Sequence, residues 1–274
     1  MKFDKMDLII FGGQSNMQGQ CEILTNSDPV EGCLEYRYLT DSVVVLKNPV
    51  GEYIKIDGSA GEGFDEKLLA EPGGEEKFIQ WLSSTALGAA CYGHTNLVPE
   101  FCKAYRQASG RNVLAVHAAK GSTKICQWQK GEFGYEMLVK KVNAAKEKCA
   151  GVERVYFVWL QGESDACASV TQAEYEEQIT ALKNNLKEDL SIERFGIIRV
   201  GHFAGDERDE KIINAQEAVC RKDDDFIMLT RITSELECTK KYMNPYVSGH
   251  YGAKGLELIG EIAGTKLGEE VSCK

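Results

Sequence analysis

The clearest indication of the fold is one stretch near the N-terminus, Leu8-Ile9-Ile10-Phe11-Gly12-Gly13-Gln14-Ser15-Asn16-Met17. Four apolar residues end abruptly in two glycines, and a serine flanked by two amide side chains follows. A short, continuous apolar run is typical of a buried strand in a parallel sheet. α/β proteins place reactive groups beyond the carboxyl ends of such strands, so Ser15 is a candidate nucleophile. Serine is also favoured as the N-cap of a helix, and on this stretch alone the cap is the preferred interpretation.

Apolar runs and amphipathic segments alternate along most of the remaining chain. This alternation predicts an α/β fold, with a central parallel sheet and helices on both faces, in a single domain spanning residues 1–274. Thr171, with Glu174 three positions later, predicts a capping box at the start of one helix. The patterns predict strands at 112–119, 154–160, 195–200 and 226–229, and helices at 96–108, 134–150, 171–190, 210–222 and 252–267.

The span from about 21 to 95 interrupts this alternation and has weak periodicity. Residues 35–39 and 43–46 resemble short strands, and residues 58–74 are rich in glycine and acidic side chains, which favours a loop. We therefore expect a loop- and β-rich insertion directly after Ser15. Such an insertion would form a rim around the candidate nucleophile and take part in substrate selection.

Composition excludes several classes of protein. The 274 residues carry a formal charge of −10 and no basic run, so nucleic acid is not an expected partner. No stretch is long and apolar enough for a membrane helix, and the N-terminus lacks a signal-peptide core, so we expect a cytoplasmic protein that makes no membrane contact. The ten cysteines contain no C-x-x-C pair, which favours scattered reduced thiols over a metal site.

The predicted strand ends carry the groups that acyl transfer requires. This chemistry needs a nucleophile, a base that takes its proton, and N–H donors that stabilise the oxyanion. Ser15 follows the first strand, and His250 lies in a glycine-flanked loop before the last helix; His202 is the rival base. The backbone N–H groups of Ser15 and Gly121 and the side-chain amide of Gln161 could be the donors. With these groups in place, the nucleophile becomes the preferred interpretation of Ser15.

Three blocks of sequence resemble a known family. They are Gly13-Gln14-Ser15-Asn16-Met17, Trp159-Leu160-Gln161-Gly162-Glu163-Ser164-Asp165 and His250-Tyr251-Gly252-Ala253-Lys254-Gly255. They are similar to the sialate O-acetylesterase and acetylxylan esterase group, carbohydrate esterase family 6, within the SGNH/GDSL hydrolase superfamily. The resemblance implies a flavodoxin-like, three-layer α/β/α sandwich and serine esterase chemistry. It also implies an acetylated sugar or oligosaccharide as substrate and no metal or organic cofactor.

The resemblance also implies roles for individual residues. Ser15 is the expected nucleophile and His250 the general base. The expected oxyanion donors are Ser15, Gly121 and Gln161. Gln14 and Asn16 are expected to brace the turn and to contact the substrate.

One position departs from the family pattern. Such families commonly carry an aspartate three residues before the histidine, to orient the imidazole, and Val247 stands at that position. Glu163 is the candidate for this third catalytic role because it follows a strand end beside the site, and Asp165 is the second candidate. A Ser–His dyad is the other possibility.

The missing aspartate keeps two further hypotheses open. The chain could be a carbohydrate-binding protein that kept the fold and lost the chemistry, or a general hydrolase of small esters. The polar, loop-rich insertion argues against a lipid substrate. The sequence indicates neither a particular sugar nor an oligomeric state.

Overall fold

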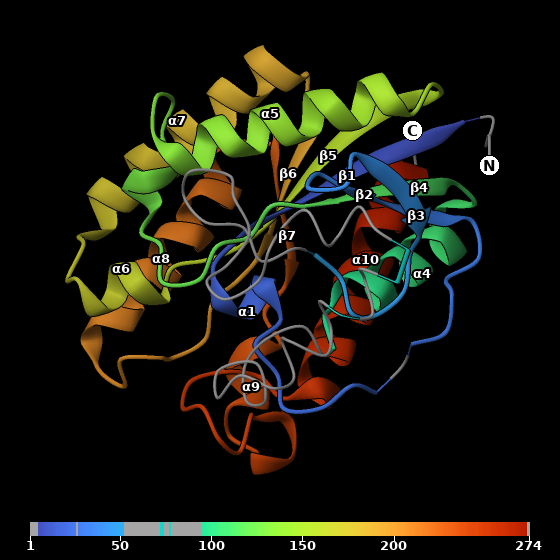
Figure 1. Cartoon of the computed structure of the whole chain (residues 1–274). Helices are drawn as coiled ribbons and strands as arrows, with labels where there is room; N and C mark the ends of the chain where they lie inside the picture. Colours follow the sequence, from blue (N-terminus) through green and yellow to red (C-terminus); the bar gives the residue numbers. More distant parts are fainter. Residues whose placement is uncertain (1–4, 26, 52–71, 74–76, 78–94, 273–274) are drawn as a thin grey trace.

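Seven strands form one sheet in the order β3-β2-β4-β1-β5-β6-β7 (Figure 1). The computed structural model describes residues 5–25, 27–51, 72–73, 77 and 95–272. The strands are β1 (Met6–Gly13), β2 (Cys33–Arg37), β3 (Ser42–Val45), β4 (Asn112–His117), β5 (Val152–Leu160), β6 (Arg194–Ile198) and β7 (Phe226–Thr230).

The strand order changes side at β1: β4 lies on one side of it and β5, the next strand in the chain, on the other. The chain moves from β1 to β4 on one side and then crosses back to β5 on the other, and all three strands are parallel. Without the β2–β3 pair the order is that of flavodoxin-like folds, which bind ligands at this switch point. The predicted parallel sheet is confirmed, with one exception: β3 pairs with β2 in antiparallel orientation at the sheet edge.

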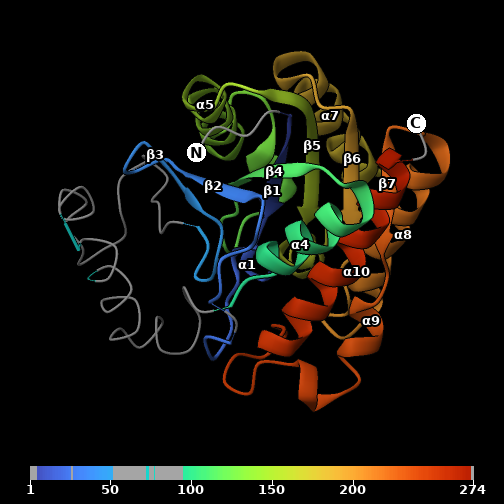
Figure 2. The same cartoon turned by 90° about the vertical axis from the view of Figure 1, so that its right-hand side faces the viewer.

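Five long helices cover the two faces of the sheet and confirm the three-layer prediction. In Figure 2, α4 (Val98–Ser109) and α10 (Ala253–Ser272) lie in front of the sheet. The opposite face carries α5 (Phe133–Lys148), α7 (Gln172–Leu190) and α8 (Glu207–Lys222) (Figure 1). Shorter elements connect these layers: α1 (Ser15–Gln18), α6 (Glu163–Cys167), α9 (Thr233–Leu236) and the 3₁₀ turns Ile125–Trp128 and Lys240–Tyr242.

Apart from Asp7, the residues of the central strand are apolar or glycine, because helices cover this strand on both faces. All eight residues of β1 are buried. Trp159 of β5 meets Trp128 edge to face, with ring centroids 5.4 Å apart, and stacks near Phe157 at 5.8 Å. Burying a large apolar side chain stabilises the fold by about 1.5–3 kcal/mol. These contacts make the sheet around β1 a rigid support for the residues that follow its strands.

Helices α4 and α10 pack closely through glycines. A Cβ atom on Gly264 would lie 2.1 Å from the Phe101 carbonyl oxygen, and one on Gly260 would lie 2.3 Å from that of Leu97. Only glycine permits this separation. The close packing holds the middle of α10 against α4, and α10 directly follows the His250 loop.

Most predicted elements of the described chain are found within a few residues of their expected bounds. The capping box at Thr171 is present, with the Glu174 N–H donating to the Thr171 hydroxyl at 3.2 Å. The two strands predicted in the insertion are β2 and β3, and they extend the central sheet. The expected loop at 58–74 lies almost entirely outside the described residues.

Two chemical features concern the described ranges as a whole. The eight cysteines within them are free thiols. No helix among these residues has the length and apolarity needed to cross a bilayer.

Candidate active site

A strained turn at the end of β1 presents Ser15. Gly13 has φ of 143°, and a Cβ there would lie 2.1 Å from the Leu160 carbonyl oxygen. The Gln14 N–H donates to that same carbonyl at 3.1 Å. Glycine is needed because the backbone passes directly over the end of β5. Ser15 is the first residue of α1, and Gln14 takes the N-cap position, so Ser15 is not the helix cap.

Ser15 and His250 lie in hydrogen-bond contact although 235 positions separate them. The Ser15 Oγ is 2.8 Å from the His250 Nε2, and the two residues are 5% and 8% exposed. The His250 Nδ1 lies 2.9 Å from the Ser248 carbonyl oxygen. A carbonyl only accepts, so Nδ1 carries the proton and Nε2 is left as the acceptor for the serine hydroxyl. The ring is therefore in the tautomer that a general base requires.

The protein lowers the pKa of His250. Burial disfavours the charged imidazolium, and the bond to the Ser248 carbonyl opposes this effect without cancelling it. His250 is consequently neutral, and able to accept a proton, at neutral pH.

Asn16 fixes the loop that carries His250. Its Nδ2 donates to the Gly249 carbonyl at 3.3 Å, and its Oδ1 accepts from the Tyr251 N–H at 3.1 Å. The same Nδ2 donates to the Glu163 Oε1 at 2.8 Å. With 2% of its surface exposed, Asn16 holds both neighbours of His250. Asn16 therefore braces the turn and the His250 loop, and its contact with the substrate stays a prediction.

Glu163 does not take the place predicted for a third catalytic residue. Its Oε1 accepts from Asn16, whereas the Nδ1 of His250 is engaged by the Ser248 carbonyl. The other oxygen, Oε2, is buried and has no hydrogen-bond partner in the described part of the chain. Burial raises the pKa of this carboxyl. In the described part of the chain, the hydrogen bonds of Glu163 link it to the His250 loop through Asn16.

Gln161 also departs from its expected role as an oxyanion donor. Its Nε2 donates to the Thr123 carbonyl at 2.8 Å and to the Asp165 carboxylate. Its Oε1 accepts from the Tyr175 hydroxyl at 3.1 Å. The side chain is completely buried. Both amide hydrogens of Gln161 have acceptors within the protein. In this structure its side chain holds neighbouring residues in place and offers no free N–H to an oxyanion.

Gln14 supports the site in a similar way. Its Oε1 accepts from the Ser164 N–H at 3.2 Å and from the Gln161 Nε2 at 3.2 Å. At 3% exposure Gln14 braces the start of α6 through this oxygen, and its contact with the substrate stays a prediction. Asp165, the second candidate for orienting His250, accepts from the Ile125 N–H at 3.0 Å instead. Burial raises the Asp165 pKa to about 6.

Gly121 lies beside Ser15, where an oxyanion donor is needed. A Cβ on Gly121 would be 3.7 Å from the Ser15 Cβ. Its N–H donates to the side-chain oxygen of Gln18 at 2.8 Å. The Ser15 N–H, the first of α1, has no hydrogen-bond partner among the residues that the structure describes. Gly121 is thus a close neighbour of Ser15, and the Ser15 N–H is left without a partner in the described structure.

The other histidines are engaged elsewhere. His202, the rival base, has Nδ1 against Glu237 at 2.5 Å and Nε2 against Glu210 at 3.0 Å. Both ring nitrogens therefore have carboxylate partners, which raise the pKa of His202. Neither nitrogen is left to accept a proton from Ser15. His117 is buried, with Nε2 3.0 Å from the Met17 carbonyl oxygen. His94 lies outside the described residues.

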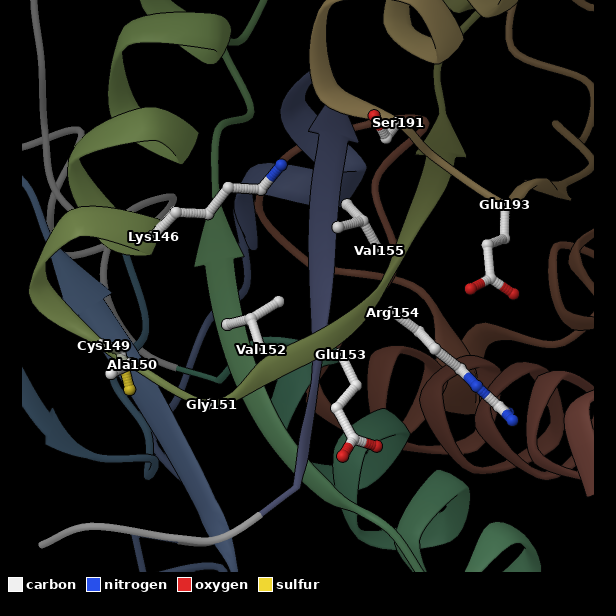
Figure 3. A pocket seen from close by; sticks show the side chains of 10 residues that line it. All are labelled: Lys146, Cys149, Ala150, Gly151, Val152, Glu153, Arg154, Val155, Ser191 and Glu193. Atoms are coloured by element: carbon white, nitrogen blue, oxygen red, sulfur yellow. The ribbon is translucent and has the colours of Figure 1, made fainter.

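Two cavities occur at the opposite, amino-terminal edge of the sheet. One, of about 360 Å³, surrounds the start of β5 (Figure 3). In it, Lys146 reaches from α5 toward the turn at Ser191 and donates to the Leu190 carbonyl at 2.9 Å. The other, of about 380 Å³, lies at the start of β2. Neither cavity includes a residue of the Ser15 site. Within the described ranges, no cluster of acidic, histidine and cysteine residues could hold a metal ion.

Comparison with solved structures gives the class of the fold. An Arabidopsis thaliana protein superposes with a TM-score of 0.61 and 18% identity, over 96% of this chain and 98% of that one. NanS superposes with a TM-score of 0.60 and 12% identity, over 99% and 98%. A catalytic mutant of Axe2, an acetylxylan esterase from Geobacillus stearothermophilus, gives a TM-score of 0.50 and 12% identity, over 96% and 94%. The fold is the predicted flavodoxin-like, three-layer α/β/α sandwich.

Sequence comparison then gives the family. The family model for carbohydrate esterases described as sialic acid-specific acetylesterases matches residues 92–244, more than half of the chain, and the protein belongs to this family. The matched residues include Gly121, Gln161 and Glu163, whereas Ser15 and His250 lie on either side of them. A probable carbohydrate esterase of Arabidopsis thaliana is 34% identical over 101 residues, which are 37% of this chain and 38% of the relative.

Three groups that bond to residues of the site were not predicted from the sequence. They are the Gln18 side chain, the Ser248 carbonyl and the Tyr175 hydroxyl. The spacing of Gln18 from Ser15, which places both in one short helical turn, was the only available signal for Gln18. A backbone carbonyl such as that of Ser248 leaves no signal in residue type. Tyr175 lies on an ordinary amphipathic helix, where an aromatic residue is typical of the core.

Proposed function

We propose that this protein is a serine esterase that removes O-acetyl groups from a carbohydrate through an acyl-enzyme. The observation that carries the proposal is the 2.8 Å contact between the Ser15 Oγ and the His250 Nε2, with the proton of His250 held on Nδ1 by the Ser248 carbonyl. A nucleophile within reach of a correctly protonated base is the signature of covalent catalysis by serine.

Acylation begins at the Ser15 hydroxyl. Its oxygen attacks the acetyl carbonyl carbon while the His250 Nε2 takes the hydroxyl proton. The carbonyl oxygen of the substrate becomes an oxyanion, and the N–H groups of Ser15 and Gly121 stabilise it. The intermediate then collapses: the bond to the sugar oxygen breaks, and the imidazolium returns its proton to that oxygen. The sugar leaves with a free hydroxyl, and the acetyl group remains on Ser15.

Deacylation repeats these steps with water. His250 takes a proton from the water molecule, and the resulting hydroxide attacks the acetyl carbonyl carbon. The second tetrahedral intermediate expels the Ser15 oxygen, which recovers its proton from His250. Acetate leaves, and the starting enzyme is restored. No group other than the protein side chains, the backbone N–H donors and water takes part in this sequence.

The substrate class in this proposal rests on the family. Its description names a carbohydrate esterase specific for acetylated sialic acid, and Axe2 is described as an acetylxylan esterase. The experiment is a comparison of steady-state hydrolysis rates on O-acetylated sialic acid, acetylated xylo-oligosaccharide and p-nitrophenyl acetate. We expect turnover of p-nitrophenyl acetate and a higher kcat/KM on at least one acetylated sugar.

The matched control is Ser15→Ala, which removes the nucleophile and leaves the turn intact. It should lower kcat by at least about 10³-fold, in the range seen when a catalytic triad loses a member. Unchanged hydrolysis by this variant would rule out Ser15 as the nucleophile. Binding of the sugars without any turnover by the wild-type protein would instead favour the carbohydrate-binding hypothesis. Turnover of simple esters alone would favour a general small-ester hydrolase.

A further inference from the structure

The side chain of Gln18 accepts a hydrogen bond from one of the two backbone N–H groups proposed as oxyanion donors. The Gly121 N–H donates to the Gln18 Oε1 at 2.8 Å. A Cβ on Gly121 would lie 2.9 Å from that oxygen and 3.7 Å from the Ser15 Cβ. The Gln18 amide oxygen therefore accepts from the N–H that the proposed mechanism assigns to the oxyanion, on a residue that is a close neighbour of Ser15.

An amide oxygen resembles the substrate group that this donor should bind. Both it and an ester carbonyl oxygen are neutral acceptors that suit a single backbone N–H. The oxyanion that forms in the reaction needs the same donor more strongly, because hydrogen bonds to a charged acceptor are about twice as strong as neutral ones. An acceptor held at that point would repel the oxyanion. Gln18 therefore has to leave the Gly121 N–H before the intermediate forms.

Only the side chain of Gln18 is free to move. Its backbone N–H donates to the Gln14 carbonyl at 2.8 Å, and its own carbonyl accepts from the Asn96 Nδ2 at 3.0 Å. The residue is half-buried, so part of its surface is exposed to solvent. A rotation about the side-chain bonds would release Gly121 without disturbing α1.

We propose that Gln18 is an internal ligand of the oxyanion hole, which occupies the Gly121 N–H in the free enzyme and is displaced by the acyl oxygen of the substrate. This proposal rests on the esterase function proposed above. Gln18 then competes with every substrate, and esters whose acyl oxygen binds weakly are disfavoured. Displacing Gln18 therefore lowers kcat/KM. The chemical step, and with it kcat, is unaffected once the side chain has moved.

Three substitutions at Gln18 separate the acceptor from the bulk of the side chain. Gln18→Ala removes both, Gln18→Met keeps the length and removes the acceptor, and Gln18→Glu replaces the amide by a carboxylate. Freeing one hydrogen bond of ordinary net strength should raise kcat/KM about fivefold in the alanine and methionine variants, with kcat within about twofold of wild type. The glutamate variant should lose at least about tenfold in kcat/KM at neutral pH, because a charged acceptor binds the donor more tightly and repels the oxyanion.

Gln20 provides the matched control. It is a half-buried glutamine whose Nε2 would lie 3.1 Å from a Cβ on Gly121, yet it makes no side-chain hydrogen bond to Gly121 in the structure. Gln20→Ala should leave kcat/KM within about twofold of wild type. A decrease or no change in kcat/KM for Gln18→Met would overturn the proposal.

A spectroscopic readout keeps this proposal distinct from the esterase proposal. In a ¹H–¹⁵N spectrum of the full chain, the Gly121 amide proton should move upfield in Gln18→Ala and Gln18→Met as it loses its acceptor, and should stay in place in Gln20→Ala. An unmoved Gly121 resonance in the Gln18 variants would overturn the proposal. If the wild-type protein hydrolyses no ester at all, the esterase function falls, and the Gly121 resonance still decides whether Gln18 occupies that donor.

Discussion

At the scale of single residues, His250 differs from a histidine oriented by a carboxylate. Its Nδ1 faces the neutral carbonyl of Ser248. A carboxylate would stabilise the imidazolium that forms during proton transfer, whereas a carbonyl stabilises it only through its dipole. Burial disfavours the charged ring, and the bond to the carbonyl opposes this effect without cancelling it, so the pKa of His250 is lowered. The base is thus kept neutral over a wider pH range.

The pH dependence of activity should reveal this lowered pKa. The mechanism requires neutral His250, so activity is lost as the pH falls through the His250 pKa and the ring becomes protonated. Because the pKa is lowered, the acid limb of kcat/KM on p-nitrophenyl acetate should have its midpoint below the ordinary histidine value of about 6.5. A midpoint clearly above that value would contradict the assignment.

Asp165 is the control for this profile, because its pKa of about 6 lies in the same range. Its carboxylate binds the Ile125 N–H and the Gln161 amide, and it contacts neither Ser15 nor His250 in the described structure. Asp165→Asn should therefore leave the acid midpoint in place. A shift of the midpoint in this variant would show that Asp165, and not His250, sets the acid limb.

Asn16 should act as a positioning residue for His250. Replacing Asn16 by alanine removes the bonds to Gly249 and Tyr251, which fix the loop on both sides of the histidine. Since a misplacement of about 1 Å can cost 10²-fold in rate, kcat should fall about 10- to 100-fold, with KM changed by less than about threefold. A purely structural role would instead lower the melting temperature and leave kcat of the folded fraction unchanged.

Glu163→Gln tests how Glu163 contributes. The glutamine keeps an oxygen for the Asn16 amide and removes the negative charge. If Glu163 only anchors Asn16, this variant should retain kcat within about fivefold of wild type. A loss as large as that of Asn16→Ala would show that the charge of Glu163 itself is required.

The sequence indicated that Ser15 and His250 would lie together, as they do, better than it indicated the directions of the amide side chains around them. Ser15 and His250 are distinctive residue types placed at a strand end and in a glycine-flanked loop. The direction of a glutamine side chain depends on partners far away in sequence. Gln161 turns inward because Thr123 and Tyr175 take its amide, and nothing near Gln161 in the sequence indicates this.

At the scale of elements, long periodic segments were predictable and short ones were not. Helix α7 covers 19 residues, and its capping box and amphipathic spacing define it. Helices α1 and α9 have four residues each, which is too few for a 3.6-residue period to appear. These short elements are formed by tertiary contacts, such as the bond from Asn96 to the Gln18 carbonyl.

The α4–α10 interface should be sensitive to added volume. Gly264→Ala would place a Cβ 2.1 Å from the Phe101 carbonyl oxygen, and backbone on both sides prevents local relief. Overpacking of this kind costs about 1–3 kcal/mol. We expect a lower free energy of unfolding in urea, whereas Glu269→Ala, on the exposed side of α10, should stay within about 0.5 kcal/mol of wild type. Equal stabilities of the two variants would contradict the close packing.

At the scale of the whole molecule, the strand order explains why distant residues meet. The chain leaves β1 toward β4 and returns to β5, so the carboxyl ends of these three strands lie together. Ser15, Gly121 and Glu163 follow them in that order, and α10 brings His250 back over the same edge. Alternating strands and helices predict such an edge. The direction in which each side chain points at this edge depends on packing against distant residues. The neighbouring sequence does not indicate it.

The proposed function requires Ser15 to be a nucleophile that His250 activates. The most direct measurement is mass spectrometry of the intact chain and its peptides after incubation with a serine-directed phosphonate. The wild-type protein should gain one phosphonyl group, located on Ser15, whereas Ser15→Ala should gain none and His250→Ala should react at least about 10²-fold more slowly. A folded wild-type protein that stays unlabelled at Ser15, or that is labelled equally fast without His250, would contradict the account.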